Sequence, residues 1–100
     1  MEKRTKCYNS GRISGLSLIA AAKKFGDADK VIFRLGYQPV NPLYNCLQWT
    51  APWLLHMIVD IISLMRCPVV FFQRDWMESR GARIEFRIAR MMGKEMIFQK

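Results

Sequence analysis

The sequence predicts an α/β fold: a three-layer sandwich with a small, mainly parallel sheet of about four strands. Two observations predict it. Short apolar segments alternate with longer segments of helical periodicity, which is the pattern of a parallel sheet with helices on both sides. The run Val69-Val70-Phe71-Phe72 is apolar throughout, as in a strand that is buried on both faces. One hundred residues suffice for one domain with a modest core, so we expect a single domain over residues 1–100.

The first predicted strand and the loop after it lie near the start of the chain. Residues 6–10 are a weak strand candidate, because their apolar content is limited to Cys7 and Tyr8. The loop over residues 11–15 begins and ends with glycine. Free backbone N–H groups in such a loop favour an anion, so the loop is either a phosphate site or an ordinary strand-to-helix turn.

Residues 16–35 carry apolar side chains at largely helical spacing and predict the first helix. Gly26 is a position where this helix could be interrupted, and Gly36 is a typical residue just beyond a helix end. Residues 37–40 then predict a short strand, and residues 43–50 have no clean period and predict a loop.

The second half of the chain predicts a helix, two strands and a third helix between them. Pro52 stands at a favoured first helical position, and residues 53–66 predict the second helix. Pro68 ends that helix, because proline cannot continue it. The buried strand over Val69–Phe72 follows, and residues 95–98 predict the last strand.

The third helix is expected between an N-cap at Ser79 and a terminating glycine at Gly93. Glu85 lies inside the broad apolar arc of this helix and is the only charged residue there. Burying a carboxylate is costly unless it is paired or protonated, so Glu85 is either solvated or salt-bridged, or it has a function. Four arginines share another, narrow arc: Arg80, Arg83, Arg87 and Arg90. This arginine stripe is either a solvated face or a binding surface.

Asp60 poses the same question in the second helix, where apolar residues flank it. Two such carboxylates can divide the roles of nucleophile and acid when their environments separate their pKa values. Each could instead cap a helix, pair with arginine or face water. His56, one turn before Asp60, is interpreted as a core or surface histidine, and no second histidine or cysteine lies near it. We therefore expect no metal and no cofactor.

Composition limits the classes of partner. The net charge of +8 favours anions such as nucleotides, and the absence of a nucleic-acid-binding motif argues against nucleic acid as the partner. The most apolar run, residues 51–65, is too short to span a bilayer, and the N-terminus lacks the apolar region of a signal peptide, so we expect no membrane association. The three cysteines are widely spaced and suit a reducing cytoplasm: Cys7, Cys46 and Cys67.

The predicted topology also locates the site. In parallel sheets, ligands bind beyond the carboxyl ends of the strands. Those ends are residues 10–15, residues 41–42 and residues 73–79. The last of these leads into the helix start at Ser79, whose backbone N–H groups and dipole favour an anion, although Ser79 also serves as an ordinary cap.

Three segments resemble a known family. They are Cys7-Tyr8-Asn9-Ser10-Gly11-Arg12-Ile13-Ser14-Gly15, Gly36-Tyr37-Gln38-Pro39-Val40-Asn41-Pro42 and Trp76-x-x-Ser79-x-Gly81-Ala82-x-x-Glu85-x-x-x-Ala89-x-x-x-Gly93. The resemblance covers nearly the whole chain and is to the nucleoside 2-deoxyribosyltransferase-like superfamily, in particular to its short branch, domain of unknown function 4406. It implies a Rossmann-like or flavodoxin-like sandwich, and oligomers in which a neighbour helps to close the site.

The resemblance also implies roles for individual residues. In the better-understood branches, the glutamate of the last segment attacks the anomeric carbon of a (deoxy)ribose, which implies this role for Glu85. An aspartate of the preceding helix assists at the nucleobase and sugar, which implies Asp60, and a tyrosine of the first strand matches Tyr8. In the nucleotide-hydrolysing branch, a serine six positions before the glutamate helps to hold the 5′-phosphate, which implies Ser79, with Gly81 beside it. The other residues of the implied pocket belong to the loop: Gly11, Arg12, Ile13, Ser14 and Gly15.

The chain departs from the family pattern at several positions. Pro68 stands where many relatives carry a second aspartate, Arg12 replaces a proline, and Asn9 interrupts an apolar strand. Two hypotheses follow. The first is an enzyme that cleaves the N-glycosidic bond of a nucleoside or nucleotide, as a deoxyribosyltransferase or a hydrolase. The second is a non-catalytic nucleotide-binding or sensing module. The very apolar second helix and the three tryptophans predict a homo-oligomer.

Overall fold

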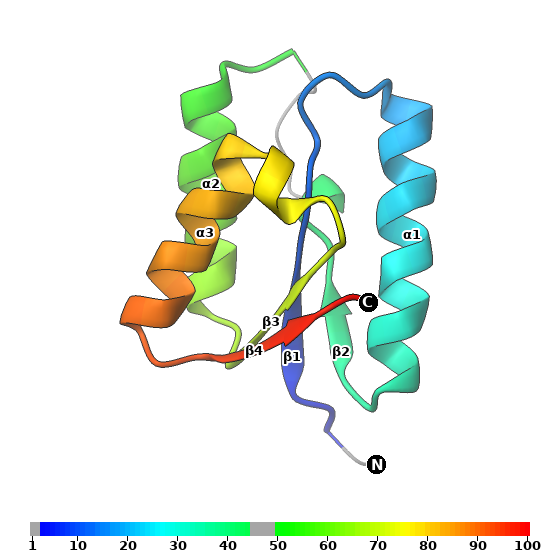
Figure 1. The fold of residues 1–100 in the computed structure, drawn as a ribbon, viewed down its shortest axis with the longest axis vertical. Helices are drawn as coiled ribbons and strands as arrows, with labels where there is room; N and C mark the ends of the chain where they lie inside the picture. The colour runs from blue at the N-terminus through cyan, green and yellow to red at the C-terminus, as the bar shows by residue number, and fades with distance from the viewer. Residues whose placement is uncertain (1–2, 45–49) are drawn as a thin grey trace.

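The structure is a computed structural model that describes residues 3–44 and 50–100 (Figure 1). In the described residues, four strands form one parallel sheet in the order β2-β1-β3-β4. They are β1 (Lys6–Ser10), β2 (Gln38–Val40), β3 (Val69–Phe72) and β4 (Glu95–Phe98). The predicted α/β class and its parallel sheet of about four strands are confirmed, and each strand lies where the sequence pattern predicts it.

Helices cover both faces of the sheet, which makes the three predicted layers (Figure 1). Helix α1 (Leu18–Arg34) packs on one face, against β1 and β2. Helices α2 (Trp53–Met65) and α3 (Arg80–Met91) pack side by side on the other face. No helix of the part of the chain that the structure describes is long and apolar enough to cross a membrane.

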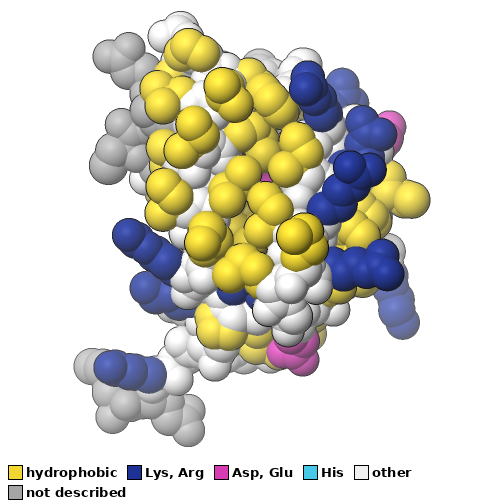
Figure 2. All heavy atoms as spheres, turned by 90° about the vertical axis from the view of Figure 1, so that its left-hand side faces the viewer, with side chains coloured by type: hydrophobic (Ala, Val, Ile, Leu, Met, Phe, Trp, Pro, Cys, Tyr) yellow, Lys and Arg dark blue, Asp and Glu magenta, His cyan; other side chains and the backbone are white. Residues whose placement is uncertain are grey.

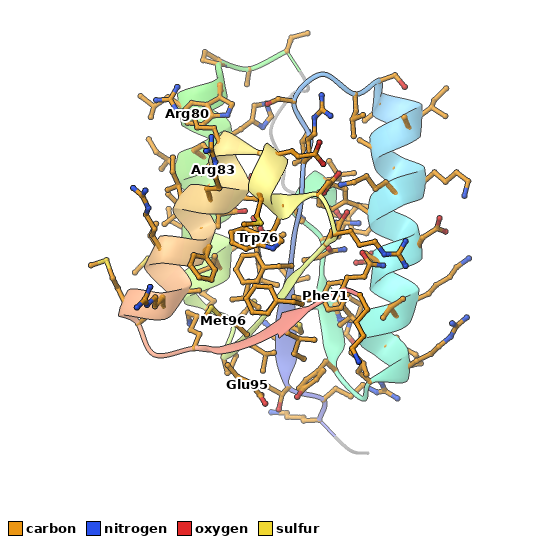
Figure 3. All side chains as sticks on the ribbon, in the orientation of Figure 1. Phe71, Trp76, Arg80, Arg83, Glu95 and Met96 are labelled. Atoms are coloured by element: carbon orange, nitrogen blue, oxygen red, sulfur yellow. The ribbon has the colours of Figure 1, made fainter. Side chains whose placement is uncertain are left out.

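The core has two halves because successive strand residues point to opposite faces. Toward α2 and α3, the buried residues are Tyr8, Leu64, Cys67, Val70, Phe72 and Ala89. Toward α1, they are Cys7, Ala28, Ile32, Val69 and Phe71. Figure 3 shows Phe71 on the α1 side and Trp76 on the other side of the sheet. All four residues of β3 are buried, as the continuous apolar run predicts.

An aromatic cluster ties α3 to the sheet. The ring of Phe86 stacks on Trp76 with a centroid distance of 4.7 Å, and Phe72 stacks on Phe98 at 5.3 Å. The two pairs also contact each other, with Phe72 and Phe86 edge to face at 5.7 Å. Because Phe86 is adjacent to Glu85 in α3, this packing helps to fix the position of the Glu85 side chain.

Asn9 interrupts the apolar pattern of β1, and the structure accounts for it. The side chain is completely buried. Its Nδ2 donates to Oδ1 of Asp29 at 2.8 Å and to the carbonyl oxygen of Phe25 at 3.1 Å. Its Oδ1 accepts a hydrogen bond from Nε2 of Gln73 at 2.7 Å. Every hydrogen-bonding group of this amide therefore has a partner, so its burial carries no desolvation penalty for an unpaired group.

Helix boundaries differ slightly from the predicted ones. Helix α1 starts after Ser17, whose side chain caps it, and it runs through Gly26 without interruption. Gly36, with a φ of 97°, follows its end as predicted. Pro52 is the N-cap of α2 and not its first helical residue, which corrects the prediction.

Two short 3-10 helices were not predicted, η1 (Pro42–Tyr44) and η2 (Trp76–Glu78). The first occupies the start of the loop that was expected over residues 43–50. The rest of that predicted loop, including Cys46, lies largely outside the described residues. Cys7 and Cys67 are buried free thiols.

Candidate active site

A cavity of about 300 Å³ opens at the carboxyl ends of the strands, which is the size of a small-molecule site. Its walls come from the loop after β1, from η1, from the first half of α2 and from the start of α3. Most of the residues that the sequence nominated line it: Gly11, Ile13, Ser14, Gly15, Asp60, Ser79, Gly81 and Glu85. The topology thus brings together residues that are far apart in the chain, such as Ser10 and Glu85, which are 75 residues apart.

Glu85 lies at the buried end of this cavity, with 4% of its surface exposed. Its Oε2 accepts a hydrogen bond from the Tyr8 hydroxyl at 2.6 Å, and its Oε1 accepts one from the Ser10 hydroxyl at 2.8 Å. Burial raises the pKa of Glu85 to about 7, the two hydrogen bonds oppose that rise, and the charge of Asp60 adds to it. The carboxyl group is therefore held in one orientation and changes its charge near neutral pH.

Tyr8 stands behind Glu85 and does not itself line the cavity. Its ring is completely buried, and burial together with the Glu85 charge raises the pKa of Tyr8 well above its usual value. The phenol consequently stays neutral and donates to the carboxylate at any physiological pH. Ser10 was not nominated from the sequence. The signal was present, because Tyr8 and Ser10 are two residues apart on a strand and so point to the same face.

Asp60 lies on α2, across from Glu85, and also lines the cavity. It is 7% exposed, so two carboxyl groups share one largely buried space. The repulsion between them disfavours ionisation of Glu85, as its raised pKa reflects. Such a pair is the arrangement in which two carboxyl groups take different roles in one reaction.

The start of α3 forms the wall next to Glu85. Ser79 is its N-cap, as predicted, and the hydroxyl oxygen accepts a hydrogen bond from the backbone N–H of Ala82 at 3.1 Å. Gly81 lets α3 approach α2 closely, because a Cβ at this position would lie 2.9 Å from Sδ of Met57. The positive end of the α3 dipole therefore faces the cavity, where it favours a negatively charged group.

Arg12 was nominated with the loop, and the structure places it away from the cavity wall. Its Nε donates to the carbonyl oxygen of Ser14 at 3.1 Å, and its backbone N–H donates to Oδ1 of Asp75 at 3.3 Å. The side chain folds over its own loop, since a Cβ on Gly15 would lie 3.0 Å from the Arg12 guanidinium. A phosphate-binding role for Arg12 stays a prediction.

The outer part of the cavity includes residues for which the sequence predicts no role in the site. Trp53, His56 and Met57 line it from α2, and Trp53 is 37% exposed. The guanidinium of Arg80 lies over the Trp53 ring, 4.7 Å from its centroid. Figure 3 shows Arg80 at the end of α3 that lies beside the start of α2. Among the described residues, no group of His, Cys, Asp or Glu side chains could hold a metal ion.

Comparison with known proteins gives a family match and a match to a solved structure. The profile of DUF4406, a domain of unknown function, matches residues 5–98. Among solved structures, the 2-desoxiribosyltransferase from Leishmania mexicana superposes with a TM-score of 0.69 at 13% sequence identity, covering 94% of this chain and 63% of that one. The chain thus spans less than two thirds of the length of that transferase. No curated protein matches it.

The family match covers all four strands and all three helices of the described residues, and it contains the cavity. The structural likeness is to the fold alone, because the identity is low. The chain belongs to the DUF4406 family and shares its fold with the Leishmania mexicana 2-desoxiribosyltransferase.

Proposed function

We propose that this protein cleaves the N-glycosidic bond of a nucleoside or nucleotide, with Glu85 as the nucleophile. The observation that carries the proposal is the setting of Glu85: a buried carboxyl group in a cavity, oriented through both oxygens, with its pKa raised to about 7. A carboxylate that only stabilised the fold would gain nothing from burial beside a second carboxyl group. A carboxylate that attacks carbon must be fixed in direction and poorly hydrated, and burial provides both.

The reaction would proceed in two steps. The ionised carboxylate of Glu85 attacks C1′ of the sugar as the base departs, which gives a glycosyl-enzyme ester. Water then attacks C1′ and releases the sugar, or a second base attacks and a new nucleoside forms. The first outcome makes the protein a hydrolase and the second a deoxyribosyltransferase. Tyr8 and Ser10 each donate to one oxygen of Glu85, so they keep the carboxylate aligned for this attack. The chemistry requires no metal or cofactor.

The other walls of the cavity fit the remaining parts of such a substrate. Asp60, beside Glu85, is suited to contact the sugar and base. Ser79 and Gly81, at the positive end of α3, are suited to a 5′-phosphate, with the loop from Gly11 to Gly15 opposite. The similar structure is itself a 2-desoxiribosyltransferase, which supports this substrate class.

Free thiols at Cys7 and Cys67 support a reducing cytoplasm as the location of the protein.

Turnover tests the proposal. The protein is incubated with each of the four 2′-deoxynucleosides and their 5′-monophosphates, and released base is measured by liquid chromatography. We expect release of base by the wild type and loss of at least about 1,000-fold in the Glu85→Gln variant, which keeps the shape but cannot attack carbon. Chelation of metals should leave turnover unchanged.

Calorimetry with the same ligands distinguishes an enzyme from a protein that only binds nucleotides. Two results together would contradict the catalytic proposal and favour a nucleotide-binding module. The wild type would bind a nucleotide at micromolar concentration without releasing base, and Glu85→Gln would bind it within a few-fold of the wild-type affinity.

We also propose that the protein forms a homo-oligomer through α2. The outer face of this helix is 42% to 64% exposed at five large apolar residues: Leu54, Leu55, Ile58, Ile62 and Met65. Figure 2 shows that hydrophobic side chains cover much of this face and that Lys and Arg side chains border it. Monomeric proteins rarely expose apolar patches of this kind. Trp53 belongs both to this helix and to the cavity wall, so a second copy bound here would lie next to the cavity.

A further inference from the structure

His56 is the group in the cavity that the proposed reaction has not yet used. Three ionisable side chains line the cavity: His56, Asp60 and Glu85. Within residues 3–44 and 50–100, no hydrogen bond or ion pair reaches the imidazole of His56. The ring is half-buried in the cavity wall, so its nitrogens can contact a ligand that enters the cavity.

The position of His56 along α2 indicates which part of the ligand it faces. Asp60, His56 and Trp53 follow one another at about one helical turn, and all three line the cavity. Exposure rises along this row, from 7% at Asp60 to half-buried at His56 and 37% at Trp53. The helix therefore runs from the floor of the cavity to its mouth. With the sugar carbon at Glu85 and Asp60 on the floor, a bound nucleoside would have its base along His56 toward Trp53.

The chemistry of the proposed reaction requires a proton at that place. As the C1′–N bond breaks, its electron pair moves to the base, and a purine or pyrimidine anion is a poor leaving group unless it is protonated. Glu85 cannot supply the proton, because it must be ionised to attack. Tyr8 cannot supply it, because its hydroxyl is engaged with Glu85 behind the cavity wall. Asp60 acts on Glu85 through its negative charge, and a carboxylate that carries this charge can contact the sugar and base but has no proton to give.

We propose that His56 is the catalytic acid that protonates the departing base. This inference rests on the proposed function. In the first step, the imidazolium N–H gives its proton to a ring nitrogen of the base while the Glu85 oxygen bonds to C1′ and the C1′–N electron pair goes to the base. In the second step, the neutral imidazole removes a proton from the attacking water, the C1′–O bond to water forms, and Glu85 leaves as a carboxylate. The sum of the two steps is nucleoside plus water to sugar plus base, and His56 and Glu85 return to their starting states.

The test compares leaving groups that do and do not need a proton. The His56→Gln variant keeps a polar side chain of similar reach and loses the acid. Its kcat/KM is measured on 2′-deoxyguanosine and 2′-deoxyadenosine, and on their N7-methylated forms, whose bases depart as neutral molecules. We expect a loss of about 100-fold or more on the unmethylated nucleosides and less than about 3-fold on the methylated ones, since general acids contribute about 10² to 10⁴.

The matched control is Ile19→Gln, which places the same side chain at an exposed position of α1, outside the cavity and away from the outer face of α2. It should leave kcat/KM unchanged on both kinds of substrate, and both variants should unfold at the wild-type temperature.

Two results would overturn the inference in distinguishable ways. Equal loss, or no loss, on both kinds of substrate in His56→Gln would remove the acid role and leave the Glu85 chemistry intact. Failure of the wild type to cleave either kind of substrate would remove the proposed function and this inference with it.

Discussion

At the scale of single residues, the protein is organised around the competition between burial and hydrogen bonding at Glu85. Burial disfavours its charge, and the hydrogen bonds from Tyr8 and Ser10 favour it. The balance leaves the pKa at about 7, above the usual 4.5 of the side chain. Because the folded protein binds this proton more tightly than the unfolded chain, the contribution of Glu85 to stability is lost as pH rises from about 4.5 to about 7. The site is stabilised least at the pH where the carboxylate can react.

The raised pKa of Glu85 gives a direction for the pH dependence of turnover. Only the ionised carboxylate attacks, so on an N7-methylated nucleoside, whose base departs without an acid, kcat/KM should rise with pH, about tenfold per unit below 7, and level off above it. The rate is measured from pH 4.5 to pH 8 on that substrate. An activity that falls as pH rises through 7 would mean that Glu85 acts in its protonated form, and it would contradict the nucleophile assignment.

Ser10 offers a control on the cause of that pH dependence. The hydrogen bond from its hydroxyl lowers the pKa of Glu85, and Ser10→Ala removes it. The midpoint of the pH–rate curve should therefore move to higher pH in Ser10→Ala. An unchanged midpoint would assign the titration to another group, with Asp60 the nearest candidate in the cavity.

At the scale of elements, two glycines differ in whether the surrounding structure has space for a side chain. A Cβ on Gly11 would lie 2.5 Å from Cδ of Gln73, which is 2% exposed and bonded to Asn9. A Cβ on Gly26, inside α1, meets nothing within 4 Å. The first glycine is thus required by packing of the loop after β1, and the second is not.

Unfolding in urea measures this difference. We expect Gly11→Ala to lower the free energy of unfolding by about 1 to 3 kcal/mol, because Gln73 cannot move without breaking its hydrogen bond. Gly26→Ala is the matched control and should raise it by up to about 1 kcal/mol, because alanine is the better helix former. Equal stability of the two variants would show that the loop accommodates a side chain at position 11.

The elements themselves were largely predictable from local pattern. The apolar run Val69–Phe72 predicts a buried strand from four adjacent residues, and this prediction is confirmed. Ser79 and Gly93 predict the two ends of α3 from local residue type, and this prediction is also confirmed. The 3-10 turn η2 was missed because three residues have no period to detect.

Features that depend on distant partners were less predictable. The backbone N–H of Arg12 donates to Asp75, which lies 63 residues away, so no local pattern indicates how this loop is held. Ser10 was missed for a related reason. The sequence indicates that Ser10 shares a face of β1 with Tyr8, but its contact with Glu85, 75 residues later, follows only when β1 and α3 are placed against each other.

At the scale of the whole molecule, the exposed apolar face of α2 should govern assembly. Ile58 is 47% exposed on that face, and Ile19 is 84% exposed on α1, on the opposite side of the sheet. Sedimentation should find an oligomer for the wild type and for Ile19→Asp, and a monomer for Ile58→Asp, because a buried unpaired charge is costly only in the interface. A wild type that stays monomeric at micromolar concentration would contradict assembly through α2.

The same cavity, fold and family would serve a protein that only binds nucleotides, so the central claim is that a bond forms between Glu85 and C1′. A nucleoside that carries fluorine at C2′ and a good leaving group tests it, because fluorine slows the release of the ester more than it prevents its formation. Mass spectrometry of the digested protein should find the fluorinated sugar on the peptide that contains Glu85, and no adduct in Glu85→Gln. Release of base without any adduct, or an adduct on Asp60 in place of Glu85, would contradict it.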